Sequence, residues 1–255
     1  MNLYREDIMS KGIIYINSSH ENLKYVKEAE ESAKSFKKYI PDAEYILYTD
    51  ATSFKSEVFD EVRETNFDMP EILHNTDHKN GQMVAKHRAL LESKYDKTMY
   101  LGSDTYALTN DVGSLFDLLD RFDVAASHAP WRINTTAGNT SIPEIPVCYP
   151  EFNCDVVLYN NNEKIMEMLE SWKDMYLKHE FQHPHDQGAF RYLMYFSDLG
   201  IATLPEEYNY RGKSWRKDTV ILQNRDLLPE YLNPSRNRVN SGTSLITRIK
   251  RKIFG

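Results

Sequence analysis

The side chains best suited to bind a charged ligand follow the apolar run Thr98–Leu101, which has the composition of a buried strand. Gly102 breaks this run, and Ser103 and Asp104 come directly after it. In open α/β sheets, ligands lie just beyond the carboxyl ends of such strands. A carboxylate there is a hard oxygen ligand for Mg²⁺ or Mn²⁺, ions that are commonly shared with substrate phosphates. The spacing therefore predicts a phosphate-binding edge at Ser103 and Asp104.

A second carboxylate, Asp186, stands immediately before a segment that we expect to be helical as far as Phe196. A carboxylate at a helix N-terminus accepts hydrogen bonds from free N–H groups and interacts favourably with the helix dipole. The position alone therefore predicts a capping role for Asp186.

The elements that would position these groups begin with a βαβ unit. Gly12–Asn17 reads as a buried strand, an apolar helix face extends to about Ile40, and Ala43–Asp50 reads as a second strand. Such a crossover is normally right-handed, and a nucleotide edge commonly lies at the end of the first strand. Asn17 and Ser18 are therefore candidate nucleotide-binding residues.

The rest of the chain continues to alternate strands and helices, which predicts an α/β fold with a mixed, mainly parallel central sheet flanked by helices. Between two of these elements, the polar stretch Trp131–Pro150 is long for a compact domain and is either a wall of an acceptor site or a surface insertion. The expected strands are Phe67–Leu73, Thr98–Leu101, Phe122–Ser127, Phe152–Asn160, Ile201–Leu204 and Thr219–Gln223, and the expected helices are Phe54–Val62, Gln82–Lys94, Asn110–Asp120, Asn161–His179 and the segment ending at Phe196.

Composition narrows the class of protein. The 255 residues carry a formal net charge of −7, which argues against general nucleic-acid binding. The two cysteines, Cys148 and Cys154, are too few for a disulfide framework and lack metal-ligand spacing. No apolar run is long enough to cross a bilayer, and the N-terminal residues do not read as a signal peptide. We therefore expect a cytoplasmic protein.

Four short motifs resemble those of glycogenin-like GT-A glycosyltransferases, and they occur in the same order over residues 12–223. The resemblance implies a single GT-A (Rossmann-like) domain over residues 1–224. It also implies a nucleotide-diphosphate sugar donor such as a UDP-sugar, a glycan or other hydroxyl acceptor, and retention of the sugar's configuration. The motifs are Tyr-Leu-Gly-Ser-Asp-Thr at 100–105, which is similar to Leu-Asp-Ala-Asp-Thr, Phe-Asn-Cys-Asp-Val-Val-Leu-Tyr-Asn at 152–160, Asp-Gln at 186–187, and Leu-Pro-Glu-Glu-Tyr-Asn-Tyr at 204–210.

The same resemblance assigns roles to individual residues. Asn153 matches a residue that contacts donor sugar or acceptor, and Asp186 matches one that points at the donor sugar. Lys86 lies sixteen residues before Gly102, the approximate spacing of a phosphate-binding lysine in this family, and His87 and Arg88 add positive potential beside it. Lys213 is similar to a second phosphate-binding lysine. The simpler interpretation of Lys86 is a solvated helix lysine.

At three positions the chain departs from the family pattern. Gly102 replaces the first aspartate of the Asp-x-Asp motif, and Gln223 stands where the family has a metal-binding histidine. Asp104 alone remains as a ligand for Mn²⁺ or Mg²⁺, so metal-independent binding stays open, with Asp104 on the ribose. Asp155 replaces a glycine and could bind sugar hydroxyls, act as base or nucleophile, or accept backbone hydrogen bonds. The alternative function is a GT-A-like protein that binds nucleotide or glycan with little or no turnover.

The C-terminal tail, residues 225–255, differs from the rest. Within it, Ser244–Phe254 predicts a basic amphipathic helix. Its apolar residues Leu245, Ile246, Ile249 and Ile253 are set against Arg248, Lys250, Arg251 and Lys252. Such a helix either contacts an anionic membrane surface peripherally or packs on the domain.

Overall fold

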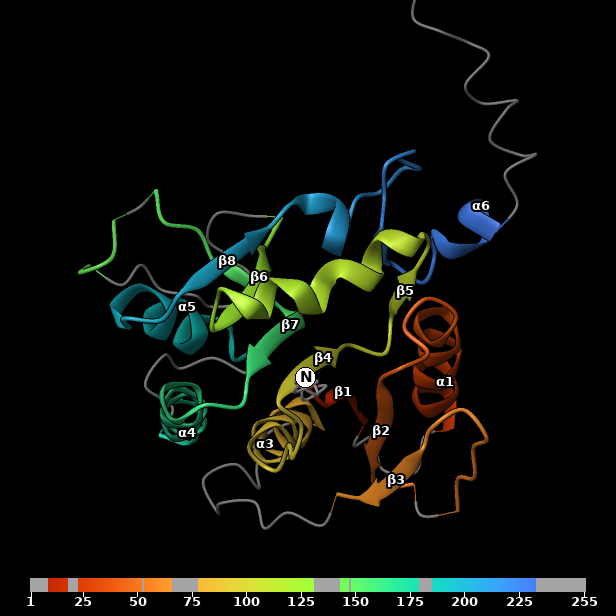
Figure 1. Ribbon diagram of the computed structural model, residues 1–255, viewed down its shortest axis with the longest axis horizontal. Helices are drawn as coiled ribbons and strands as arrows, with labels where there is room; N and C mark the ends of the chain where they lie inside the picture. Colours follow the sequence, from red (N-terminus) through yellow and green to blue (C-terminus); the bar gives the residue numbers. More distant parts are fainter. Residues whose placement is uncertain are drawn as a thin grey trace, which may run out of the picture.

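The computed structural model describes residues 9–17, 23–51, 53–65, 78–130, 143–146, 148–178 and 185–232. Within these ranges the chain forms a central sheet with helices on both faces and a small second sheet at one edge (Figure 1).

The fold starts from the predicted βαβ unit. Strand β1 (Lys11–Asn17) and strand β2 (Glu44–Thr49) run parallel, and helix α1 (Leu23–Lys37) connects them. Val26, Ala33 and Phe36 on α1 are fully buried, as the apolar periodicity predicts.

The central sheet has seven strands in the order β3-β2-β1-β4-β7-β6-β8, and only β7 runs against the others. The predicted fold class is therefore confirmed. A second sheet pairs β5 and β9 antiparallel. The strands not yet given are β3 (Glu61–Glu64), β4 (Lys97–Leu101), β5 (Thr105–Ala107), β6 (Val124–His128), β7 (Phe152–Asn160), β8 (Ile201–Leu204) and β9 (Ile221–Gln223).

Helices cover the two faces of the sheet unequally. Helix α1 and the 3₁₀ helix η1 (Asn110–Asp120) pack on one face, while α3 (His78–Leu91), α4 (Glu163–Leu177) and α5 (Gln187–Phe196) pack on the other (Figure 1). Two short helices, η2 (Glu206–Asn209) and α6 (Leu228–Leu232), flank β9. None of the helices in the part of the chain that the structure describes has the length and apolar character needed to cross a membrane.

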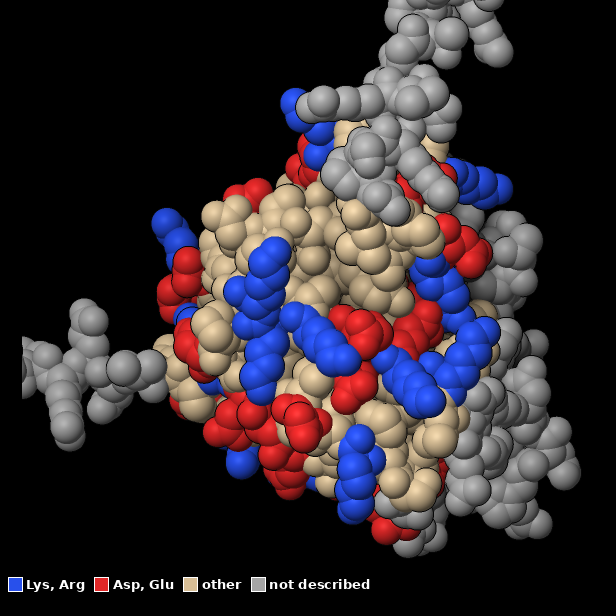
Figure 2. Space-filling view, turned by 90° about the vertical axis from the view of Figure 1, so that its right-hand side faces the viewer, with Lys and Arg blue, Asp and Glu red and all other residues tan. Residues whose placement is uncertain are grey.

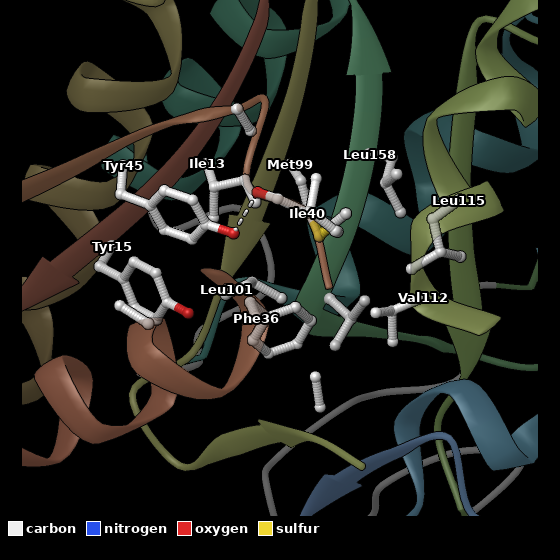
Figure 3. Packing of buried hydrophobic residues seen from close by; sticks show 14 of the residues in the cluster. Ile13, Tyr15, Phe36, Ile40, Tyr45, Met99, Leu101, Val112, Leu115 and Leu158 are labelled. Carbon is white, nitrogen blue, oxygen red and sulfur yellow. Dashed lines mark hydrogen bonds between the residues drawn. The ribbon is translucent and has the colours of Figure 1, made fainter. Parts of the chain in front are cut away.

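Successive side chains of a strand point to opposite faces of the sheet and therefore belong to two different hydrophobic cores. On β1, Ile13 and Tyr15 face α1 and η1, whereas Ile14 and Ile16 face the opposite set of helices. This two-residue period is the reason that one apolar strand serves two cores. On the α1 side, the buried Tyr45 hydroxyl donates to the Ile40 carbonyl over 3.0 Å, so its one polar group is satisfied (Figure 3).

The outer surface of α1 is strongly charged but mixed in sign. Figure 2, which views the side of the molecule where α1 lies, shows acidic and basic side chains next to one another. Lys34, for example, lies 2.7 Å from Glu31 and 3.7 Å from Glu30. Exposed pairs of this kind favour the helix by a few tenths of a kcal/mol each, roughly.

One predicted element is wrong. Phe54–Val62 was expected to be a helix, but it forms turns that lead into β3. The Asp60 backbone N–H donates to the Tyr45 carbonyl, and its carboxylate accepts from the Tyr45 N–H at 2.9 Å. These bonds attach the segment to the edge of β2 and override its helix propensity. The predicted strand Phe67–Leu73 lies outside the described residues, as do part of Trp131–Pro150 and the predicted tail helix.

Replacing Gly12 with alanine is expected to destabilise the protein by about 1–3 kcal/mol, because the added methyl group would overpack the core. An ideal Cβ at Gly12 would lie 2.0 Å from the Tyr95 ring, and that ring is held by a hydrogen bond from its hydroxyl to Glu44. Gly113→Ala is the matched control, since its Cβ would meet nothing closer than 3.7 Å. Urea unfolding measures both, and equal losses would contradict the packing argument.

Candidate functional site

The reversed strand β7 brings the predicted site residues to one edge. Because β7 is antiparallel to β4, its first residues lie at the carboxyl edge of the parallel strands. Leu101 pairs with Val156, and the Gly102 N–H then donates to the Asp155 carbonyl over 2.8 Å. Asn153 and Asp155 therefore lie beside the turn that carries Asp104, which is the edge where ligands of such sheets bind.

Two carboxamides hold Asp155, one by its carboxylate and the other by its backbone N–H. The Gln223 amide nitrogen donates to Asp155 Oδ2 over 2.5 Å, and the Gln223 oxygen accepts from Asn153 Nδ2 over 2.8 Å. The Asn153 oxygen in turn accepts from the Asp155 N–H at 2.8 Å. Asn153 and Gln223 are both buried, so this closed set of bonds fixes the Asp155 side chain in place.

Asp104 lies in a crowded electrostatic environment. Burial raises the pKa of its carboxyl group, the charge of Asp155 raises that pKa further, and the charges of Arg225 and Arg211 oppose both effects. Arg225 Nη2 lies 3.8 Å from Asp104 Oδ2, and Arg225 Nε lies 2.9 Å from Glu28 on α1. Burial likewise raises the pKa of Glu28, which Arg225 partly offsets. Among the described residues, three carboxylates, those of Glu28, Asp104 and Asp155, thus share this edge with two guanidinium groups, those of Arg225 and Arg211.

Beneath the start of β7 lies a buried ion pair. Lys86 Nζ on α3 is 2.9 Å from Asp186 Oδ2 and donates to the Cys154 carbonyl at 2.8 Å. Its ammonium also lies 4.6 Å from the Tyr100 ring centroid and 4.9 Å from that of Trp172. Lys86 is 1% exposed and Asp186 is 3% exposed. The simple interpretation of Lys86 as a solvated helix lysine is therefore wrong.

Asp186 is not the helix cap that its position suggests. It occupies the N-cap position of α5, but its side chain makes no capping hydrogen bond. Instead, the carboxylate turns toward Lys86. Burial alone would raise the pKa of Asp186, but the charge of Lys86 and the contact with His87 outweigh it and hold that pKa far below the ordinary value. The pair is therefore charged at neutral pH.

The neutral state of His87 predicts a loss of stability in mild acid. The His87 ring is buried, with its centroid 4.8 Å from that of Trp172, and burial lowers the pKa of His87. The folded protein therefore does not bind the proton that His87 of the unfolded chain takes up near its ordinary pKa of about 6.5. Stability from this group is present above that pH and is lost as the pH falls, by up to about 1.4 kcal/mol per pH unit. In His87→Gln, unfolding free energies measured between pH 7.5 and 5.5 should fall less steeply; an unchanged slope would contradict the assignment.

The other predicted residues are distributed around this edge. Asn17 is buried at the end of β1, and Ser103 is partly exposed beside Asp104. Lys213 is exposed on a loop whose Gly212 carbonyl accepts from Asn224, next to Gln223. Ser18 lies outside the described residues. A direct contact of Lys86 with a phosphate, or of Asp186 with a sugar, would require the buried pair to open.

Three contributions were missed at the sequence level. Gln223 was expected only as a weak substitute for a metal-binding histidine, whereas it holds Asp155. Arg225 was assigned to the tail and Glu28 had no predicted role, yet the two pair beside Asp104. No local sequence pattern predicts these contacts, because they join residues that lie from 68 to 197 positions apart.

The donor set of this edge is compatible with a hard divalent cation that also has substrate ligands. Asp104 and Asp155 supply carboxylate oxygens, and Mg²⁺ is usually bound by one or two carboxylates together with phosphates and water. Within the ranges that the structure describes, no three histidine, cysteine, aspartate or glutamate side chains gather to hold a metal ion by themselves.

Comparison with known proteins identifies the architecture. No protein-family profile and no curated protein matches the chain. Among solved structures, the apo form of the glycosyltransferase GlyE of Streptococcus pneumoniae TIGR4 superposes with a TM-score of 0.55 at 18% identity, covering 85% of this chain and 55% of GlyE. The apo structure of the bifunctional glycosyltransferase WbbM gives a TM-score of 0.52 at 13% identity, covering 88% of this chain and 47% of WbbM.

The chain has a GT-A glycosyltransferase fold. It spans about half the length of GlyE and of WbbM. A more distant match is the galactosyltransferase LgtC in complex with donor and acceptor sugar analogs, with a TM-score of 0.49 at 14% identity, covering 84% of this chain and 87% of LgtC.

Proposed function

We propose that this GT-A protein is a glycosyltransferase that moves a sugar from a nucleotide-diphosphate donor, a UDP-sugar, to a hydroxyl of a glycan or similar acceptor, with retention of configuration. The observation that carries the proposal is the convergence at one sheet edge of Asp104, Asn153 and Asp155, which lie up to 51 positions apart in the sequence. This edge is where ligands of open α/β sheets bind.

The arrangement suits the charges that develop during sugar transfer. Positive charge grows on the sugar ring and negative charge on the leaving diphosphate, so preorganised groups of opposite sign lower the barrier. The fixed carboxylate of Asp155 and the amide of Asn153 are suited to the sugar side. Arg225 and the exposed Lys213 are suited to the phosphate side. Asn17, Ser18 and Ser103 are proposed for the nucleotide.

Lys86 and Asp186 serve this site from beneath. Lys86 holds the Cys154 carbonyl, which belongs to the residue between Asn153 and Asp155. We therefore assign the buried pair as positioning residues for the start of β7. Asp104 is proposed to hold Mn²⁺ or Mg²⁺, which when bound would neutralise charge on the leaving diphosphate.

Release of nucleotide from a panel of UDP- and GDP-sugars, with and without Mn²⁺, tests the proposal. Wild-type protein is expected to release UDP, and Asp104→Asn should lower the rate on the order of 10²–10³-fold, the loss typical of a group that stabilises developing charge. Asp174→Asn on the far helix α4 is the matched control and should keep the wild-type rate. No release from any donor, despite measurable UDP binding, would instead support a binding protein without turnover.

A further inference from the structure

At the candidate site, the backbone of Gly102 lies close to the side chain of Asp155. An ideal Cβ at Gly102 would lie 3.1 Å from the Asp155 Cβ and 3.2 Å from its Cγ and Oδ1. A side chain at position 102 would therefore crowd the Asp155 carboxylate, and one of the two would have to shift. Gly102 directly follows β4 and Asp155 lies on the neighbouring strand β7, so the Asp155 carboxylate stands where a side chain at position 102 would begin.

We propose that Asp155 supplies, from β7, the carboxylate that the chain lacks at position 102, so that Asp104 and Asp155 together hold a divalent cation against the diphosphate of the donor. This inference rests on the proposed function. It differs from the expected site in its ligand set, because one carboxylate comes from β7, next to β4 in the sheet, and not from the turn that carries Asp104. It also reassigns Asp155 from the sugar to the diphosphate.

The charges around the two carboxylates favour a cation. Three carboxylates, those of Glu28, Asp104 and Asp155, share this edge with the guanidinium groups of Arg225 and Arg211. A diphosphate brought to this edge alone would meet like charge, whereas a bound divalent cation reverses the sign of the site.

The hydrogen bond that Gln223 donates to the Asp155 carboxylate engages one of its two oxygens. Gln223 donates to Oδ2, and Oδ1 is the oxygen that lies near Gly102. Gln223 therefore acts as a positioning residue that orients Asp155, comparable to the outer partners that orient metal ligands in other proteins. This explains why an amide can stand at position 223 without serving as a ligand.

The test measures Mn²⁺ binding directly, by the electron paramagnetic resonance signal of free Mn²⁺ titrated with protein in the presence of UDP. UDP affinity is measured alongside by calorimetry in Mn²⁺ and in EDTA. Asp155→Asn keeps an oxygen for the Gln223 hydrogen bond and removes only the charge, so it should weaken UDP-dependent Mn²⁺ binding at least about tenfold, the smallest loss typical of altering even a partner of a metal ligand. Asp174→Asn should leave binding unchanged.

A positional exchange completes the test. Gly102→Asp combined with Asp155→Gly returns one carboxylate to the same space from the other strand and should recover most of the lost Mn²⁺ affinity, whereas Asp155→Gly alone should not. Thermal unfolding confirms that each variant is folded.

Two results would overturn the inference while leaving the proposed function intact: UDP binding that is equally tight in EDTA and Mn²⁺, or Mn²⁺ binding unchanged in Asp155→Asn. Failure of the wild-type protein to bind UDP or GDP under any condition would refute the proposed function itself and the inference with it.

Discussion

Replacing Asp186 with asparagine should lower the free energy of unfolding by about 3–5 kcal/mol, the usual loss when one partner of a buried ion pair is removed. Lys86 would then keep its charge in a site from which water is excluded, with the Cys154 carbonyl as its remaining polar contact among those described. Urea denaturation at pH 7 measures the change.

A matched control for this loss is available on the surface. Lys164 and Asp198 lie at the same separation of 2.9 Å, but their side chains are 55% and 83% exposed. Asp198→Asn should therefore leave the unfolding free energy essentially unchanged, because water screens exposed pairs. If both variants lost equal stability, burial would not be the source of the effect.

The second large effect is on the rate of sugar transfer when both charges of the Lys86–Asp186 pair are removed. Lys86→Gln with Asp186→Asn leaves two neutral side chains that can hydrogen-bond to each other and to Cys154. The double variant should be more stable than the sum of the two single losses predicts, since neighbouring residues are not additive. Its rate of sugar transfer should nevertheless fall on the order of 10²-fold, because the Cys154 carbonyl loses its ammonium donor and a small misplacement of the start of β7 is enough to slow the reaction.

Measuring both the stability and the rate of the double variant distinguishes an effect on folding from an effect on sugar transfer. A double variant that regains stability but stays slow shows that the buried charges are needed to position the active site. A double variant with the wild-type rate would show that the charges of the pair are not needed at the active site. The measurement is donor turnover at saturating UDP-sugar, with urea denaturation on the same samples.

Much of the fold could be predicted because its signals are local. The β1–α1–β2 unit follows from two apolar runs and one amphipathic helix, and Phe152–Asn160 and Ile201–Leu204 match the strands residue for residue. The failure at Phe54–Val62 arose where contacts with β2 decide the conformation.

The site was predictable in part only. The order of the motifs selected Asp104, Asn153, Asp155 and Asp186, and the structure places the first three at one edge. Neither the pairing of Lys86 with Asp186 nor the contact between Gly102 and Asp155 could be derived, because both depend on the register between strands and on helix packing. Solvent exposure of a lysine is likewise set by tertiary structure, which is why Lys86 looked like a surface residue.

A single residue, Cys154, connects the buried Lys86–Asp186 pair to the hydrogen bonds that Gln223 makes with Asn153 and Asp155. The carbonyl of Cys154 accepts from the Lys86 ammonium, while its neighbours on either side take part in the Gln223 hydrogen bonds. Any rearrangement of α3 or α5 that moved this oxygen would also tilt the Asp155 backbone. A ¹³C label at the Cys154 carbonyl would therefore respond, in one spectroscopic signal, both to the ionisation of the interior pair and to the arrival of a ligand at the rim.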